Sequence, residues 1–155
     1  MSGQSSSDDI LVFIMRHGEA ESLRLDDKSR QLTDAGRKQV SRAASWLQDT
    51  WCRDGKVDLA LVSPFRRARQ TYDMFSLDIN ASKMEIFADI TPDGDAQNVH
   101  EYLDARLSTS KAREQNLKRI LLVSHMPLVS YLVDAMCDSY TTSLFATASI
   151  AVIRY

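Results

Sequence analysis

The sequence predicts an α/β fold: a single-domain layered sandwich with a mostly parallel central sheet and helices on both faces. Three short apolar segments, residues 10–15, 59–62 and 120–123, are each followed by polar residues and then by a segment of helical character. Short runs that are apolar on both faces are typical of buried parallel strands, and their alternation with helices is typical of layered α/β folds. Residues 148–153 form the last expected strand.

Four helices are expected because apolar side chains recur at helical spacing between and after these strands. Thr33 can cap the first helix, which ends before the turn at Asp54, and Pro64 suits the first turn of the second helix. The four helical segments are residues 33–51, 64–75, 99–107 and 127–136. Residues 19–31 show no clear period and residues 76–95 end in strong turn chemistry, so both are expected to be loops.

A chain of 155 residues has the size of one domain, and it can bury a core without disulfide bonds or structural metals. Residues 1–9 are polar and rich in serine, so we expect a disordered tail ahead of a folded domain at residues 10–155. The tail lacks the basic and apolar regions of a secretory signal, and a cytoplasmic location is expected. The widely separated Cys52 and Cys137 are expected to stay reduced.

Composition excludes two classes of partner. The net charge of -2 does not fit the strongly basic surface of a nucleic-acid-binding domain. No segment approaches the roughly 20 apolar residues of a membrane-spanning helix, so no membrane partner is expected. A small anionic substrate remains compatible with both observations, because a site can be locally positive on a nearly neutral protein.

Residues that carry chemistry follow three of the expected strands. Arg16 and His17 follow the first strand, Ser63 follows the second, and Ser124 and His125 follow the third. The carboxyl ends of parallel strands share one edge of the sheet, and ligands bind at that edge. The sequence therefore predicts that two histidines and several arginines meet there.

His17 and its neighbours suit phosphoryl transfer. A neutral imidazole nitrogen can attack phosphorus and form a covalent intermediate. The planar guanidinium of Arg16 can bind phosphoryl oxygens with two donors, and Gly18 leaves room where the chain turns and the substrate approaches. Taken alone, the sequence Arg16-His17-Gly18 is also compatible with a strand that ends in a surface histidine without a catalytic role.

Arg66 and Arg67 begin the second expected helix, whose N-terminus already favours an anion. Two cations at this positive helix end would repel each other without a bound anion, so we expect a phosphate site that includes Ser63. A solvated basic helix face is the alternative. His125, at the start of the fourth expected helix, can stabilise an equatorial oxygen during phosphoryl transfer. A structural histidine is the alternative there.

Five motifs, in order, resemble the histidine phosphatase superfamily, and in particular its SixA-like branch of small protein phosphohistidine phosphatases. Each motif is weak alone, but five in the family's order are hard to attribute to chance, and they span nearly the whole chain beyond the tail. The motifs are IMRHGEA at 14–20, LTDAGRKQ at 32–39, LVSPFRRARQT at 61–71, ITPDGD at 90–95 and VSHMPLV at 123–129.

This resemblance implies that residues 10–155 form a histidine phosphatase catalytic domain. It implies that His17 is the phosphorylated nucleophile and Arg16 the arginine beside it. Arg67 matches the phosphate-binding arginine, and His125 matches the second histidine of the site, while Arg66 falls on a position that the family pattern leaves open. The chemistry needs no metal and no cofactor, and the sequence contains no metal-ligand spacing.

The resemblance also implies the substrate: phosphohistidine on a protein, expected on a histidine-phosphotransfer domain of a two-component signalling relay. Larger family members take a general acid from the segment before the second histidine, which makes Asp89 the candidate acid. A site with a weak or absent acid favours phosphohistidine, because an imidazole leaves more easily than an alkoxide. The short segment between Thr71 and His125 leaves little chain for a lid over a small substrate.

Two alternatives stay open. The first is a small-molecule phosphomonoesterase on the same scaffold. The second is a non-catalytic phosphate-binding module, against which the complete set of two arginines and two histidines argues. Mutase activity is not expected, because residues 19–31 lack the asparagine that mutase-like members carry. A monomer is expected.

Overall fold

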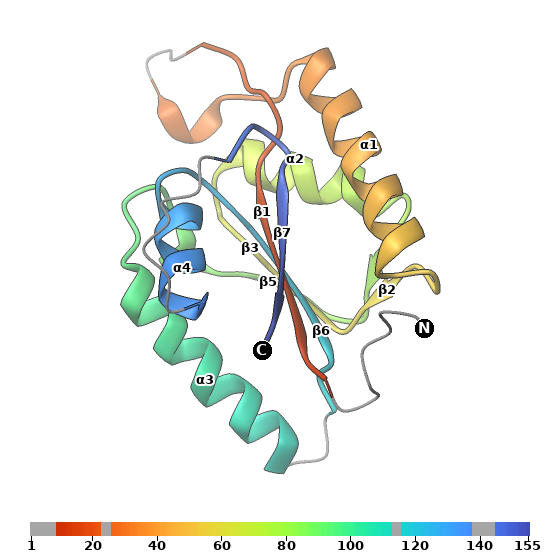
Figure 1. The fold of residues 1–155 in the computed structure, drawn as a ribbon. Helices are drawn as coiled ribbons and strands as arrows, with labels where there is room; N and C mark the ends of the chain where they lie inside the picture. The colour runs from red at the N-terminus through yellow and green to blue at the C-terminus, as the bar shows by residue number, and fades with distance from the viewer. Residues whose placement is uncertain (1–8, 23–25, 113–115, 138–144) are drawn as a thin grey trace.

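The centre of the molecule is a five-stranded sheet in the order β5-β3-β6-β1-β7 (Figure 1). The structure, a computed structural model, describes residues 9–22, 26–112, 116–137 and 145–155. A second, smaller sheet pairs β2 with β4. The strands are β1 (Leu11–Arg16), β2 (Lys56–Val57), β3 (Leu59–Val62), β4 (Asn80–Ala81), β5 (Met84–Ile86), β6 (Arg119–Ser124) and β7 (Ile150–Arg154).

Within the described part of the chain, β5, β3, β6 and β1 run parallel, and β7 runs antiparallel to β1. The β1–β6 register ends with Arg16 opposite Ser124. The backbone N–H of His17 then donates to the Ser124 carbonyl at 3.0 Å. His17 and His125, which directly follow these two strands, therefore lie at the same level of the sheet. The predicted α/β sandwich with a mostly parallel sheet is confirmed.

Two helices cover each face of the sheet (Figure 1). α1 and α2 lie over one face, and α3 and α4 lie over the other. The cluster of buried residues on each face joins strand and helix side chains into a continuous core. The helices are α1 (Asp34–Thr50), α2 (Arg66–Phe75), α3 (Ala96–Ala112) and α4 (Leu128–Cys137).

Alternation along β1 supplies both cores. Leu11, Phe13 and Met15 belong to the cluster that includes residues of α1 and α2. Val12 and Ile14 belong to the cluster that includes residues of α3 and α4. All five side chains are at most 2% exposed, because a central parallel strand is covered on both faces.

The second helix begins later than expected. Pro64 was predicted to lie in its first turn, but Phe65 is the N-cap, with φ −66° and ψ 141°, and the helix starts at Arg66. The Phe65 carbonyl accepts the N–H groups of Ala68 and Arg69 at 3.0 and 3.1 Å, so it makes the first helical hydrogen bonds. The first helix begins as expected, with the Thr33 side chain accepting from the Gly36 N–H at 2.9 Å.

The prediction of a loop over residues 76–95 was wrong in part. This segment contains β4, the edge strand β5 and a 3₁₀ helix, η2 (Ala88–Ile90). A three-residue edge strand is too short to show alternation, and Met84 and Ile86 remain 45% and 48% exposed. The other expected loop, residues 19–31, holds only a short 3₁₀ helix, η1 (Asp27–Ser29), within its described residues.

Residues 1–8 of the expected tail lie outside the described residues. Asp9, which is described, lies with its Oδ2 3.7 Å from Nε of Arg154. Among the helices that the structure describes, none is both long enough and apolar enough to cross a membrane.

Candidate active site

His17 follows β1 and is 7% exposed. Its Nδ1 lies 2.7 Å from the Gly18 carbonyl oxygen. A carbonyl only accepts, so Nδ1 carries the proton of the neutral ring. Nε of Arg67 donates to the other nitrogen, Nε2, at 3.3 Å, so Nε2 presents a lone pair. Both contacts select the same tautomer, in which Nε2 carries the lone pair.

The loop that holds Gly18 is fixed against two helices at close range. The Gly18 N–H donates to Oγ1 of Thr71 at 3.0 Å, and that hydroxyl donates to the Arg67 carbonyl at 2.8 Å. A Cβ at residue 18 would lie only 2.8 Å from the Gly36 carbonyl oxygen in α1. The backbone contact between the loop and α1 therefore requires a glycine at residue 18, and the contact orients the carbonyl that holds His17.

His125 follows β6 and is 1% exposed. Its ring centroid lies 5.1 Å from that of His17, and the two rings are tilted by 59°. Nε2 lies 2.7 Å from Oγ of Ser63, and the ring of Phe65 packs edge-on at 5.0 Å. Nδ1 is buried without a hydrogen-bond partner among the residues that the structure describes. The predicted convergence of the two histidines is therefore observed.

Arg67 joins the histidines from the first turn of α2 and is 4% exposed. Its two terminal nitrogens donate to Asp27, to the carbonyl oxygen at 2.8 Å and to Oδ2 at 3.2 Å. Its guanidinium carbon lies 5.0 Å from the centre of the Phe65 ring. These contacts orient the guanidinium so that Nε faces His17. The neighbouring Arg66 is exposed.

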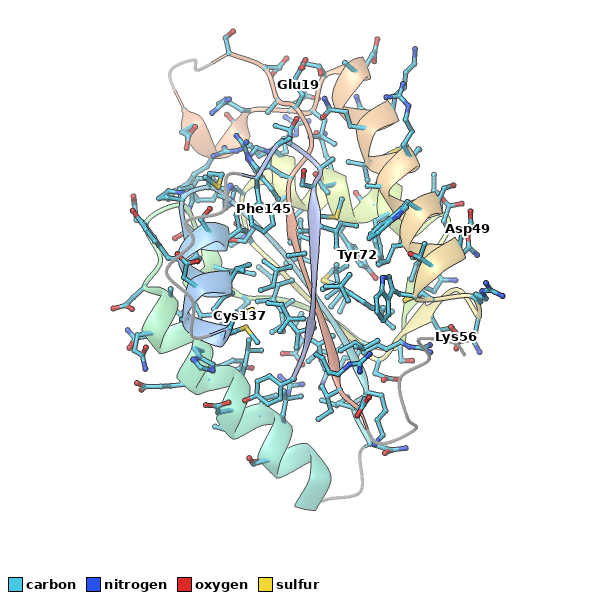
Figure 2. The ribbon with its side chains drawn as sticks, in the orientation of Figure 1. Glu19, Asp49, Lys56, Tyr72, Cys137 and Phe145 are labelled. Carbon is cyan, nitrogen blue, oxygen red and sulfur yellow. The ribbon has the colours of Figure 1, made fainter. Side chains whose placement is uncertain are left out.

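Arg16 ends β1, directly before His17. One terminal nitrogen donates to the Phe145 carbonyl at 2.7 Å. Its Nε is buried and has no partner within the described residues. Figure 2 shows Phe145 and Glu19 toward the end of the molecule at which β1 and β6 finish. Arg16 thus retains a free buried donor close to His17.

Asp27 and Arg30 belong to the site but escaped the sequence prediction. Arg30 donates to Oδ1 of Asp27 at 2.9 Å and to the Glu21 carbonyl at 2.7 Å. The carboxylate of Asp27 thereby bridges Arg30 and Arg67. Both residues lie in a charged segment without periodicity, and nothing in its spacing distinguishes these two charges from the others. Thr71 was also missed, because a threonine within a helix carries no signal of its own.

The site keeps both imidazoles neutral near pH 7. Burial lowers the pKa of His17 to about 4. The hydrogen bond to Gly18 opposes this shift, and the charges of Arg67, Arg16 and Arg30 add to it. Burial, with smaller contributions from His17 and Arg67, lowers the pKa of His125 to about 2. A neutral, oriented imidazole beside guanidinium groups can attack a phosphoryl group whose oxygens such cations bind.

Hydrogen bonds from Arg30, together with the charge of Arg67, lower the pKa of Asp27. Its carboxylate therefore stays ionised at neutral pH and is a poor source of a proton. Asp89, the predicted acid, is exposed in η2, and the side-chain hydrogen bonds of His17 and His125 in the described part of the chain are made with Gly18, Arg67 and Ser63 instead. A hydrogen bond connects η2 to the C-terminal end of β6, where the Ser124 hydroxyl donates to the Ile90 carbonyl at 2.7 Å. The role of Asp89 stays a prediction.

Ser63 lies at the predicted strand end and is completely buried. Its hydroxyl oxygen contacts Nε2 of His125 and accepts the Phe65 N–H at 3.3 Å. The expected contact of Ser63 with phosphate also stays a prediction. Across residues 9–22, 26–112, 116–137 and 145–155, no group of His, Cys, Asp or Glu side chains is arranged to hold a metal ion.

Known proteins resemble this chain over most of its length. A model of the histidine phosphatase superfamily (branch 1) matches residues 12–91. The phosphohistidine phosphatase SixA homolog of Haemophilus influenzae is 36% identical over 150 residues, 93% of this chain and 87% of that protein. Phosphohistidine phosphatase SixA of Escherichia coli is 36% identical over 143 residues, 92% of this chain and 83% of that protein.

A solved structure of a SixA protein is similar to this chain in its fold. The protein histidine phosphatase SixA complexed with tungstate superposes with a TM-score of 0.80 at 35% identity, covering 92% of this chain and 86% of that one. The likeness therefore extends from the sequence motifs to the arrangement of the strands and helices.

The free energy of unfolding is expected to decrease as the pH is lowered from 7 to 5. In the unfolded chain, His17 and His125 take up protons near the ordinary pKa of about 6.5, whereas in the folded protein they titrate at about 4 and about 2. The unfolded state thus binds more protons throughout this window, which destabilises the fold by up to about 1.4 kcal/mol per pH unit for each histidine, a limit approached toward pH 5. Urea denaturation at several pH values measures this slope.

Replacing one imidazole separates the two contributions. His17→Asn and His125→Asn should each reduce the slope between pH 6.5 and pH 5 to about half of the wild-type value. A wild-type slope near zero, or a slope that neither substitution alters, would show that the two rings are not kept neutral by the fold.

Proposed function

This chain belongs to the histidine phosphatase superfamily, and we propose that it is a protein phosphohistidine phosphatase that takes the phosphoryl group onto Nε2 of His17 and passes it to water. The observation that carries this proposal is the fixed tautomer of His17, whose Nδ1–H is held by Gly18 and whose Nε2 lone pair faces Nε of Arg67. The proposal extends to residues 10–155 as the catalytic domain.

In the first transfer, Nε2 of His17 attacks phosphorus, and the bond between phosphorus and the substrate imidazole breaks. A substrate imidazole that is protonated on its other nitrogen leaves as a neutral ring and needs no separate acid. The Gly18 carbonyl retains the proton on Nδ1 of His17 while phosphorus is bound to Nε2. The intermediate is then an imidazolium whose positive charge the carbonyl dipole stabilises.

In the second transfer, water attacks phosphorus and the bond between phosphorus and Nε2 breaks. His17 leaves as a neutral imidazole with its proton still on Nδ1, so the tautomer is restored. Water loses a proton to solvent or to the phosphate that forms. Arg16, Arg67 and His125 bind the equatorial oxygens in both transfers, which is the stabilisation that phosphoryl transfer requires.

Asp27 supports this arrangement without reacting. By accepting from both terminal nitrogens of Arg67, it holds the guanidinium with Nε toward His17. An incoming phosphoryl oxygen meets this oriented Nε–H and the buried Nε–H of Arg16, which has no partner among the described residues. The SixA relative that was solved with tungstate, a tetrahedral oxyanion, is consistent with this use of the site.

Phosphohistidine is favoured over phosphate esters because, among the described residues, the carboxyl groups of Asp27 and Asp89 are poorly suited to protonate an alkoxide. Asp27 is held ionised by Arg30 and Arg67, and Asp89 is exposed. We assign the substrate to a histidine-phosphotransfer domain of a two-component relay, acted on by a monomeric, cytoplasmic enzyme. The SixA relatives, which are phosphohistidine phosphatases, support the phosphohistidine part of this assignment.

His17→Ala should abolish hydrolysis of a phosphorylated histidine-phosphotransfer domain, with a loss of roughly 10³-fold or more because the nucleophile is removed. The measurement follows release of inorganic phosphate and, after rapid quenching in alkali, the acid-labile label on the enzyme. His100→Ala is the matched control, because His100 lies on α3 beside Asp104.

Three results are informative. Label and turnover in wild type and His100→Ala, but not in His17→Ala, would support the proposal. Turnover that survives in His17→Ala would contradict it. A wild-type chain that binds phosphate with neither label nor turnover would be a phosphate-binding module and not an enzyme.

Asp89→Asn separates the two substrate classes. If Asp89 serves as an acid, it serves alkoxide leaving groups, so the variant should lose turnover of a small phosphate ester by about 10-fold or more and retain most turnover of protein phosphohistidine. Steady-state rates on both substrates measure the difference. Equal losses on the two substrates would contradict the proposed selectivity, and a wild type that prefers sugar phosphates would favour the phosphomonoesterase.

A further inference from the structure

We propose that Ser63 is a positioning residue, whose hydroxyl donates to Nε2 of His125 and so keeps the proton of that imidazole on Nδ1, where it can donate to a phosphoryl oxygen. The proposal rests on the proposed function, because the group that Nδ1 would contact is the phosphoryl group in transfer. Ser63 would act through His125 and would not itself need to contact the substrate.

The two residues meet because their strands are neighbours. Ser63 directly follows β3 and His125 directly follows β6, and these strands pair in parallel up to Val62 opposite Val123. The backbone N–H of Ser63 donates to the Val123 carbonyl at 3.0 Å, which continues the ladder by one residue. At 2.7 Å, the contact between Oγ and Nε2 is therefore set by the register of the sheet.

Counting donors and acceptors indicates which atom carries the proton. The Ser63 oxygen already accepts the Phe65 N–H, and Ser63 is completely buried. A hydroxyl has one proton to donate. Within the described residues, Nε2 of His125 is the acceptor that lies within reach of the Ser63 hydroxyl proton. If the hydroxyl donates to Nε2, every polar atom of this pair is satisfied except Nδ1–H.

The opposite tautomer leaves two buried groups unsatisfied. If Nε2–H donated to Ser63, the serine hydroxyl proton would lack an acceptor and Nδ1 would carry a bare lone pair. Each unsatisfied buried group costs about 1–3 kcal/mol, so the Nδ1–H tautomer is the more stable one. In the favoured tautomer, the one group left without a hydrogen-bond partner is Nδ1–H of His125. This N–H can donate a hydrogen bond to an oxyanion.

The tautomer matters because a neutral imidazole has only one N–H. A bare Nδ1 lone pair would repel a phosphoryl oxygen, whereas Nδ1–H would bind it. Burial lowers the pKa of His125 to about 2, so protonation of the whole ring does not remove this choice at neutral pH. The two histidines thus use the same tautomer for opposite tasks: a bare Nε2 on His17 attacks, and a protonated Nδ1 on His125 donates.

Nitrogen NMR of ¹⁵N-histidine-labelled protein at pH 7 tests the proposal without relying on activity. We expect His125 to show a protonated Nδ1 and an unprotonated Nε2 in the wild type. In Ser63→Ala we expect the Nε2–H tautomer to become populated. Ser124→Ala is the matched control, because Ser124 ends the adjacent strand, is equally buried, and donates to a backbone carbonyl instead of a histidine.

Kinetics complete the test. Ser63→Ala should lower kcat for phosphohistidine hydrolysis by roughly 10- to 100-fold with a smaller change in KM, because the lost donor acts mainly on the transition state. Ser63→Thr, which keeps the hydroxyl, should restore the Nδ1–H tautomer and most of kcat. Ser124→Ala should leave the His125 tautomer unchanged.

A wild-type spectrum with His125 protonated at Nε2 would overturn the proposal even if no variant folds. A Ser63→Ala protein with an unchanged tautomer would also overturn it. The predicted tautomer in a wild type without phosphohistidine turnover would instead count against the proposed function alone, so the two failures are distinguishable.

Discussion

The gathering of two buried imidazoles with the buried guanidinium of Arg67 and the half-buried one of Arg16, at one end of the sheet, is the constraint on which the rest of the structure depends. Burial, aided by the charges of Arg67 and Arg16, disfavours a charged imidazole, so His17 stays neutral and keeps the lone pair on Nε2. Guanidinium groups in this position favour an oxyanion as the ligand, as the proposed function requires. Asp27, in η1, supplies part of the balancing charge through its ion pair with Arg67.

The fold supplies this constraint through backbone geometry. The parallel pairing of β1, β6 and β3 brings His17, His125 and Ser63 to one level, and the short N-terminal turn of α2 adds Arg67. The loop after β1 is held by Thr71 and by its close approach to Gly36. These attachments are made by rigid elements that are themselves anchored in the two apolar cores, which favours a pre-organised site.

Much of this arrangement could be predicted from the sequence because it depends on local patterns. The apolar runs before His17 and His125 identify buried parallel strands, and parallel strands bring their carboxyl ends together. The partners of the site residues could not be predicted in the same way. Asp27 and Arg30 come from a segment without periodicity, and the bond from Ser63 to His125 depends on strand register. The edge strand β5 was missed because three half-exposed residues carry no readable alternation.

The most direct test of a shared site is titration of ¹⁵N-histidine-labelled protein with tungstate. If the two rings share one bound oxyanion, the ring nitrogen signals of His17 and His125 should move together along one binding curve, while those of His100 on α3 remain in place. Signals of His17 and His125 that respond with different affinities, or a response in only one of them, would show that the two imidazoles do not serve a common site.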